Sequence, residues 1–136
     1  MFFPTQTKSE KEKYENLLKI LWSLSNLFSD SDVPYLYYRW AERAFCRAFN
    51  ALDHSRWDTA IDAGKGNIWI GLKTFLNGNG KTFQKVAEFN RESANFRWLL
   101  NNPSELIIEI AKLRNERLDF ARRTHWVDSL IYHCIT

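Results

Sequence analysis

Apolar side chains recur at helical spacing in the first part of the chain. Between Tyr14 and Phe28, leucine and aromatic residues follow one another mostly three or four positions apart, as on one face of a helix. Thr7 and Glu10 precede this run at the spacing of a capping box. The pattern predicts an amphipathic helix that ends at the Ser/Asp cluster of residues 29–32.

A second helix is predicted after Pro34, because proline is favourable in the first turn of a helix. Its apolar face contains Tyr38, Phe45 and Phe49, and Glu42 falls in the middle of this face. Desolvation of a carboxylate in such surroundings is costly unless a cation compensates its charge. A metal ligand at this position would explain why an acid stands there.

Two apolar segments around the sequence GKGN predict a β-hairpin, with strands at Asp58–Ala63 and Ile68–Phe75. The turn is expected at Lys65 and Gly66, and strand side chains alternate between the two faces of a sheet. One face would then be apolar and consist of Ile61, Ala63, Ile68, Ile70 and Leu72. The other face would be polar, with Asp58 opposite Lys73, and consist of Asp58, Asp62, Gly71 and Lys73.

The remaining pattern adds two helices and a last strand. Residues 81–100 are expected to form a helix, and the segment SLIYHCI predicts a buried strand. The helix between them would start at Pro103 and bury Leu106, Ile110, Leu113 and Phe120. This order of elements predicts an α/β (α+β) fold, a small mixed sheet with a central hairpin flanked by helices.

Length and composition narrow the class of protein. The 136 residues fit one domain, with an N-terminal helix in residues 1–30 and the core in residues 34–136. A hydrophobic content of 45% excludes a disordered chain, and a net charge of +3 permits a nucleic-acid partner without requiring one. Because the sequence shows no signal peptide and no membrane span, Cys46 and Cys134 are interpreted as reduced core thiols of a cytoplasmic protein.

The polar hairpin face has the residue types of a metal-dependent phosphodiesterase. The carboxylates of Asp58, Asp62 and Glu42 are oxygen ligands suited to Mg²⁺, which needs only a few protein ligands. Mg²⁺ can polarise a phosphoryl oxygen, and Lys73 can hold the attacking water or stabilise developing charge. Each residue also has a purely structural interpretation: a strand-end cap for Asp58, a solvent-facing acid for Asp62 and an edge lysine for Lys73.

This arrangement resembles the PD-(D/E)XK nuclease superfamily, in which an acid starts one hairpin strand, and a second acid, any residue and a lysine lie on the next. In several of its restriction enzymes, a glutamate on the preceding helix joins the metal site. Asp58 would match the first acid, Lys73 the lysine and Glu42 the helix glutamate. From about Tyr38 onward, three segments look like parts of bacterial type II restriction endonucleases: AERAFCRAFNALDHSRWDTAIDAGKGNIWIGLKTF, FQKVAEFN and KLRNERLDFARR.

The chain departs from the pattern of this superfamily at three points. Gly71 stands where the second acid is expected, and Asp62 on the same face is a candidate to replace it. The usual strand between the glutamate helix and the first acid is not evident. The chain also ends directly after the strand-like segment YHCIT, as would a truncated form that lacks part of its target-reading surface.

Positive charge is concentrated late in the chain, in Lys112, Arg114, Arg117, Arg122 and Arg123. Because Arg and Lys contacts to phosphates supply much of the affinity for DNA, this segment is expected to bind the DNA backbone. A solvated helix face with salt bridges is the alternative. A second possible phosphate-binding stripe consists of Arg39, Arg43 and Arg47.

The resemblance implies a Mg²⁺-dependent type II site-specific deoxyribonuclease that hydrolyses phosphodiester bonds of double-stranded DNA and is a homodimer when intact. The alternative is a non-catalytic DNA-binding or subunit-interaction domain, which Gly71 favours. A third interpretation is nucleotide binding through NGNGKT, but Phe75 stands where that loop needs its first glycine. The three histidines show no ligand spacing, which argues against a zinc site.

Overall fold

The structure, a computed structural model, describes residues 1–28, 35–56, 61–75, 92–126 and 128–136. Its helices are α1 (Lys8–Leu24), α2 (Tyr38–Phe49), α3 (Ser93–Phe96) and α4 (Pro103–His125), and short 3-10 helices span Phe3–Thr5, Ser25–Phe28 and Arg97–Asn101. Its strands are β1 (Leu52–Asp53), β2 (Ala63–Lys65), β3 (Ile68–Thr74) and β4 (Ser129–Ile135).

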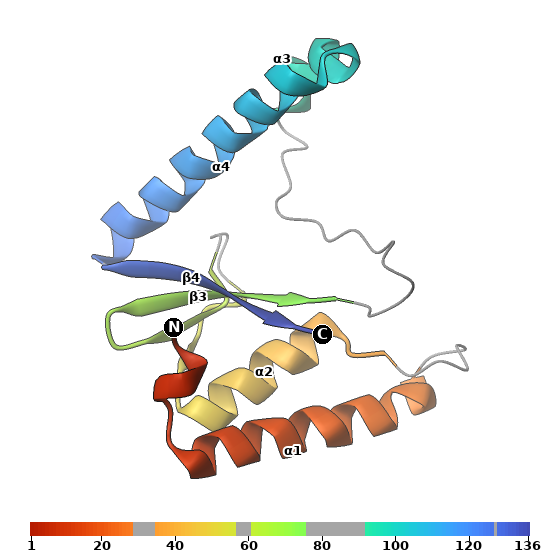
Figure 1. The fold of residues 1–136 in the computed structure, drawn as a ribbon, viewed down its shortest axis with the longest axis vertical. Helices are drawn as coiled ribbons and strands as arrows, with labels where there is room; N and C mark the ends of the chain where they lie inside the picture. Colours follow the sequence, from red (N-terminus) through yellow and green to blue (C-terminus); the bar gives the residue numbers. More distant parts are fainter. Residues whose placement is uncertain (29–34, 57–60, 76–91, 127) are drawn as a thin grey trace.

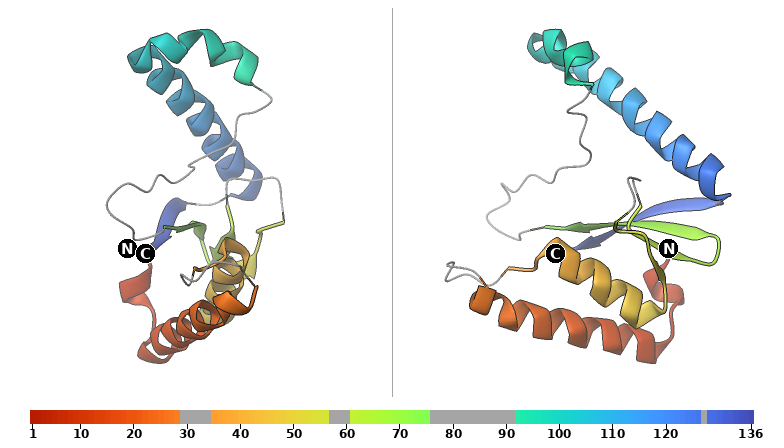
Figure 2. Two further views of the ribbon diagram at one scale, coloured as in Figure 1. Left: turned by 90° about the vertical axis from the view of Figure 1, so that its right-hand side faces the viewer. Right: turned by 180° about the vertical axis from the view of Figure 1, so that it is seen from behind.

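The strands form one mixed sheet in the order β1-β2-β3-β4. Neighbours are antiparallel from β1 to β3, whereas β4 runs parallel to β3 at the edge of the sheet. Helices α1 and α2 lie against one face of the sheet, and α4 rises from the other side (Figures 1 and 2). The predicted class, a mixed sheet with a central hairpin and flanking helices, is confirmed.

The capping box predicted at the start of α1 is present. The hydroxyl of Thr7 accepts a hydrogen bond from the backbone N–H of Glu10 at 3.2 Å, and the Glu10 carboxylate accepts one from the Thr7 N–H at 3.0 Å. Tyr14 is buried, and leucines on the same face of α1 pack against the core. The predicted apolar face is wrong at its end, because Phe28 is 66% exposed.

Two phenylalanines of α2 form the centre of the core between the helix pair and the sheet. Phe45 and Phe49 are fully buried, and their ring centroids lie 4.8 Å apart. Phe2, from the segment before α1, packs against both rings, and Ile70 of β3 belongs to the same cluster. The apolar face predicted for this helix is confirmed for Phe45 and Phe49 and wrong at Tyr38, which is exposed in the first turn.

Helix α2 begins later than predicted. Tyr37 has an extended backbone with φ −67° and ψ 128°, so the helix starts at Tyr38. Pro34, on which the prediction was based, lies outside the described residues. The helix ends at Asn50, which has a φ of 49°, in the left-handed region that asparagine tolerates at the end of a helix.

The predicted hairpin forms, but its turn lies one residue further along the chain. Lys65 pairs with Ile68, so that Gly66 and Asn67 form a two-residue turn. Gly66 has a φ of 57°, and glycine is favoured at the first central position of a type II′ turn. The expected turn at Lys65 and Gly66 is wrong. It would have placed Lys65, rather than a glycine, at the first central position of the turn.

The apolar face of the hairpin is confirmed with one exception. The cluster that packs against α1 and α2 includes Ala63, Ile68, Ile70 and Leu72. Ile61 instead packs with Trp69 of β3 and Ala121 of α4 in a smaller cluster. The chain bends at Asp62, which separates Ile61 from the strand that follows.

The helical part of the late chain agrees only partly with expectation. Residues 81–91 lie outside the described residues, and the rest of the first predicted helix forms only α3 and a short 3-10 helix. Helix α4 begins at Pro103 as predicted, with Asn102 as its side-chain cap. Its apolar face is wrong at Phe120, which is 57% exposed while Ala121 is fully buried, because α4 meets the sheet near its C-terminal end (Figure 1).

The last predicted strand is present as β4, but it is an edge strand rather than a buried one. Ile131 and Ile135 pack against the core, whereas Tyr132 is 38% exposed. Such alternation is usual for a strand with one covered face. The expectation that both cysteines are core thiols is confirmed for Cys46 and wrong for Cys134, which lies exposed on β4.

The core position of Phe45 predicts a large difference between two Phe→Ala variants. Phe45→Ala should lower the free energy of unfolding by about 3–5 kcal/mol, because it leaves a cavity among packed rings. Phe120→Ala should change it by less than about 0.5 kcal/mol, because that ring is mostly exposed. Urea denaturation followed by tryptophan fluorescence measures both, and similar losses in the two variants would contradict this description of the core.

Candidate functional site

An acid at the start of the hairpin is fixed to the neighbouring strand. Asp62 lies directly before β2, and its backbone N–H donates a hydrogen bond to the carbonyl of Ile70 at 3.0 Å. Its carboxylate oxygen Oδ2 accepts a hydrogen bond from the backbone N–H of Leu72 at 2.7 Å. Continued by one residue, the antiparallel register of the hairpin places Asp62 beside Gly71. Lys73 lies two residues after Gly71 on β3.

Helix α2 supplies a second, buried acid to this region. Glu42 is 5% exposed, and its Oε2 atom has no hydrogen-bond partner among the described residues. The guanidinium of Arg39 lies 3.9 Å from this oxygen. Burial and, to a lesser extent, the negative charge of Asp62 raise the pKa of Glu42 to about 7, against the opposing effect of Arg39 and Lys73. An oxygen with this environment favours either a proton or a cation.

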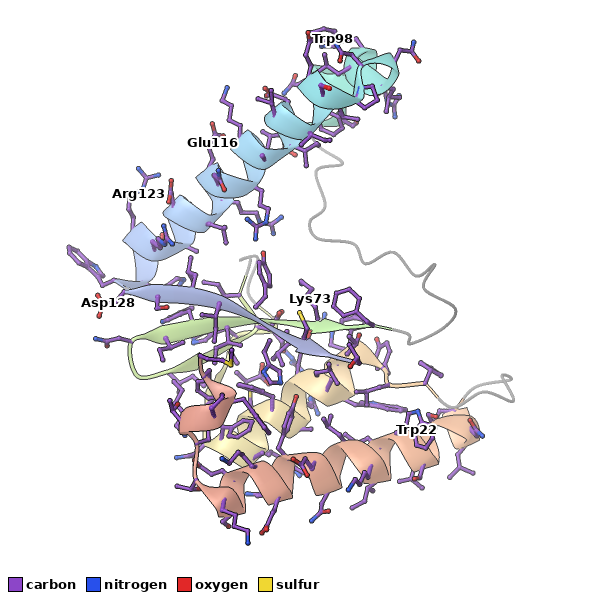
Figure 3. The ribbon with its side chains drawn as sticks, viewed as in Figure 1. Trp22, Lys73, Trp98, Glu116, Arg123 and Asp128 are labelled. Atoms are coloured by element: carbon purple, nitrogen blue, oxygen red, sulfur yellow. The ribbon has the colours of Figure 1, made fainter. Side chains whose placement is uncertain are left out.

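The pKa of Asp62 is raised as well. Burial raises its pKa, whereas the hydrogen bond from Leu72 and the charges of Lys73 and Arg39 oppose that effect. Asp62 therefore lies close enough to Glu42 to disfavour its ionisation, and Lys73 is close enough to act on both acids. Lys73 projects from β3 near the end of the strand that is remote from the hairpin turn (Figure 3).

A third acid, Asp53 at the end of β1, was not anticipated from the sequence. It accepts hydrogen bonds from the hydroxyl of Ser55 at 2.6 Å and from its backbone N–H at 3.0 Å. The Ser55 hydroxyl is the main cause that lowers the pKa of Asp53. Its negative charge also raises the pKa of Glu42 and of Asp62. The Asp-x-Ser spacing, typical of a side-chain turn, was the feature that could have indicated a fixed acid here.

The residue expected as first metal ligand, Asp58, lies outside the described residues. The pairing that placed it opposite Lys73 is wrong, because the observed turn shifts the hairpin register by two residues. Three of the four predicted catalytic residues, Glu42, Asp62 and Lys73, are described; the charges of Asp62 and Lys73 act on Glu42, and the charge of Lys73 also acts on Asp62. Asp62 directly precedes β2, close to the place that the sequence interpretation assigned to Asp58.

The acids present fit a hard divalent cation with few protein ligands. Within the described ranges, no group of three His, Cys, Asp or Glu side chains is arranged to hold a metal ion. A pair of carboxylates is nevertheless sufficient for Mg²⁺, which keeps several waters in its coordination shell. The unpartnered Oε2 of Glu42 and the raised pKa values of Glu42 and Asp62 are what such a cation would relieve.

The five basic residues expected to bind DNA divide into two groups on α4. Lys112, Arg122 and Arg123 are exposed, and Arg123 points away from the sheet (Figure 3). Arg122 forms an ion pair with Asp119 at 3.5 Å, as the salt-bridge alternative predicts for this face. Arg114 and Arg117 are half-buried, and Arg114 reaches Tyr132 of β4.

The three arginines that were expected to form a phosphate-binding stripe on α2 lie in different environments. Arg39 donates a hydrogen bond to the carbonyl of Ser55 at 2.7 Å and lies near Glu42. Arg43 and Arg47 are exposed on the outer side of the same helix. Only Arg39 therefore belongs to the surroundings of the carboxylate pair.

Two histidines that are far apart in the sequence meet at one tryptophan. Trp69 of β3 stacks with His54 at a centroid distance of 4.4 Å and with His125, the last residue of α4, at 4.2 Å. The backbone N–H of His54 also donates a hydrogen bond to the carbonyl of Asp62 at 2.9 Å. This stack supports both the end of α4 and the backbone of the candidate site. No local pattern in the sequence could have indicated it.

Comparisons of the chain with protein-family models, with curated proteins and with solved structures gave no match. In the part of the chain that the structure describes, no helix is long and apolar enough to cross a bilayer. A functional assignment therefore depends on the geometry around Glu42, Asp62 and Lys73 and on the resemblance seen in the sequence.

The raised pKa of Glu42 predicts a pH-dependent gain in stability for Glu42→Gln. The folded protein holds this proton up to a pH of about 7, whereas the unfolded chain releases it at about 4.5. The folded state is thus penalised as the pH rises through this window, and the variant should be more stable at pH 8 by about 1–2 kcal/mol. The gain should disappear below pH 4.5, as measured by urea denaturation.

The same pair of proteins tests the cation directly. Millimolar Mg²⁺ at pH 8 should raise the melting temperature of the wild type more than that of Glu42→Gln, because binding to the folded state stabilises it. Glu116→Gln serves as the matched control, since Glu116 lies on the exposed side of α4 (Figure 3). Equal responses of all three proteins would argue against a cation at Glu42.

Proposed function

We propose that the chain is a Mg²⁺-dependent endodeoxyribonuclease that hydrolyses phosphodiester bonds of double-stranded DNA. Glu42 and Asp62 would hold the metal ion, and Lys73 would lie beside the scissile phosphate. The observation that supports this proposal most strongly is the convergence of a buried helix glutamate, a hairpin acid and a strand lysine, in which the acid and the lysine both act on the ionisation of the glutamate.

The structure also bears on two departures from the PD-(D/E)XK pattern. The short strand β1 lies between the glutamate helix and the hairpin, where no strand was evident from the sequence. Gly71 still lacks the expected carboxylate, but Asp62 lies directly beside it on the neighbouring strand. Asp62 thus supports the proposal in two ways, as the acid that starts a hairpin strand and as the acid nearest to position 71.

The residues of the chain have distinct roles in the proposed reaction. The carboxylates of Glu42 and Asp62 bind and orient the ion, and the Leu72 N–H fixes the Asp62 side chain. When bound, Mg²⁺ supplies charge that polarises a phosphoryl oxygen and acidifies water. The Lys73 ammonium orients the attacking water or stabilises the negative charge that develops on the phosphate.

The resemblance to type II restriction endonucleases extends the proposal to sequence-specific cleavage. Such an enzyme cuts both strands of a short symmetric target, which is simplest for two copies related by a twofold axis. We therefore include a homodimer as the form of the intact enzyme.

Cleavage of phage DNA by the purified chain tests the proposal. Discrete fragments should form with Mg²⁺ and not with EDTA. Lys73→Ala and Asp62→Asn should each reduce the rate by about 100-fold or more, because each removes a charge beside the reacting phosphate. Asparagine at position 62 can still accept the hydrogen bond from Leu72, so a loss of activity would not be due to a lost contact.

Two exposed residues provide matched controls for this experiment. Lys19→Ala on α1 and Asp128→Asn, before β4, remove the same charges at sites remote from Asp62 and Lys73, and both should retain full activity. Full activity of Lys73→Ala would refute the assignment of the site.

A non-catalytic DNA-binding domain is the second candidate, favoured by the absence of a carboxylate at Gly71. It predicts salt-sensitive binding of duplex DNA that does not depend on Mg²⁺ or on Lys73. Intact DNA in every lane, together with a mobility shift at low salt, would support this candidate over the nuclease.

A further inference from the structure

Two cations lie against the ring of Tyr132, on the side of the sheet where α4 lies. The guanidinium carbon of Arg114, from the middle of α4, is 5.0 Å from the ring centroid. The ammonium nitrogen of Lys73, from β3, is 5.8 Å from the same centroid. Residues from three separate elements therefore bring two positive charges to one aromatic side chain.

Neither cation is in direct contact with a described acid. Arg114 and Lys73 form no ion pair with a described carboxylate, and the Nε atom of Arg114 is buried with no hydrogen-bond partner among the described residues. A buried donor without a partner is costly, and a guanidinium has five N–H donors to satisfy. An anion with several acceptor oxygens would satisfy this donor and balance both charges.

The position of Arg114 on α4 distinguishes it from the other basic residues of this helix. Arg122 is exposed and pairs with Asp119, three residues away. The residues three and four positions from Arg114 contain no acid; they are Ile110, Ala111, Arg117 and Leu118. Local salt bridges along the helix therefore account for Arg122 but not for Arg114.

The cation pair lies next to the candidate metal site. In the sheet register, Tyr132 pairs with Gly71, and Asp62 lies on the other side of the same glycine. Gly71 contributes no side chain between the aromatic ring and the acid. A chain of phosphodiesters that passes the carboxylate pair would thus reach Lys73 and Arg114 within one or two strand spacings, each about 4.8 Å.

We propose that Arg114, held with Lys73 against the ring of Tyr132, binds the backbone phosphate of the DNA that is next to the cleaved one, while Lys73 remains beside the cleaved phosphate. This inference rests on the proposed function and names the residues that position its substrate. Tyr132 acts as a positioning residue, because its ring holds both cations and its hydroxyl is not required for that contact. The Arg114 contact also ties α4 to β4.

Binding of a fluorescein-labelled 20-base-pair duplex in EDTA, followed by anisotropy at several salt concentrations, tests the inference without any cleavage step. Arg114→Met keeps most of the apolar stem and removes the charge. It should weaken binding about tenfold and reduce the slope of log K against log salt by about 1, as expected for the loss of one phosphate contact. Arg122→Met is the matched control and should change the slope less, because Arg122 is paired with Asp119.

Tyr132 variants separate positioning from charge. Tyr132→Phe should bind the duplex as the wild type does, whereas Tyr132→Leu should resemble Arg114→Met, although neither change alters the net charge. Circular dichroism melting verifies that each variant is folded. If Tyr132→Leu does not fold, Tyr132→Phe still tests whether the aromatic ring alone is sufficient for binding.

The possible outcomes separate this inference from the proposed function. If the wild type binds and cuts DNA while Arg114→Met keeps an unchanged affinity and salt slope, the phosphate site is refuted and the nuclease assignment stands. If the wild type neither binds the duplex nor cuts DNA with Mg²⁺, both are refuted, and if it cuts DNA with Mg²⁺ but does not bind the duplex in EDTA, only the phosphate site is refuted. A loss in Arg114→Met and Tyr132→Leu that Arg122→Met and Tyr132→Phe do not share supports the site.

Discussion

The hydrogen bond from the Leu72 N–H to the carboxylate of Asp62, 2.7 Å long, is the contact on which the candidate site depends. It fixes an acid at the start of β2 to the strand that contains Lys73, beyond the last paired residues of the hairpin. The register itself follows from Gly66, whose left-handed backbone sets the turn. A turn one residue earlier would have moved Asp62 away from Gly71 and removed the proposed pairing of acid and lysine.

The aromatic core determines where the second acid lies. Phe45 and Phe49 are packed between α1 and the sheet, and this orientation of α2 turns Glu42 inward as well. The protein therefore holds a carboxylate whose pKa is raised to about 7 in a place that a solvated surface acid would not occupy. Burial of an ionisable carboxylate lowers the stability of the folded protein. Such destabilising residues are typical of functional sites, where they take part in binding or catalysis.

Local patterns predicted the features of the fold that are local in origin. The capping box at Thr7, the proline at the start of α4 and the apolar face that Ile68, Ile70 and Leu72 form on β3 all arise from neighbours in sequence, and each is present. The hairpin register was missed because the segment GKGN is compatible with more than one two-residue turn. Only the observed pairing of Lys65 with Ile68 shows that Gly66 and Asn67 form the turn. The influence of Asp53 on Glu42 and the stack on Trp69 were missed because they depend on contacts between distant segments, although the local Asp-x-Ser spacing could have indicated that Asp53 is fixed.

The central claim is that Glu42 and Asp62 together bind one divalent cation, and a Mn²⁺ titration followed by electron paramagnetic resonance tests it most directly, because Mn²⁺ accepts the same oxygen ligands as Mg²⁺. The account predicts one bound Mn²⁺ per wild-type chain, no bound ion in a Glu42→Gln/Asp62→Asn double variant, and competition by Mg²⁺. Equal binding by the wild type and the double variant, or no binding by either, would contradict it.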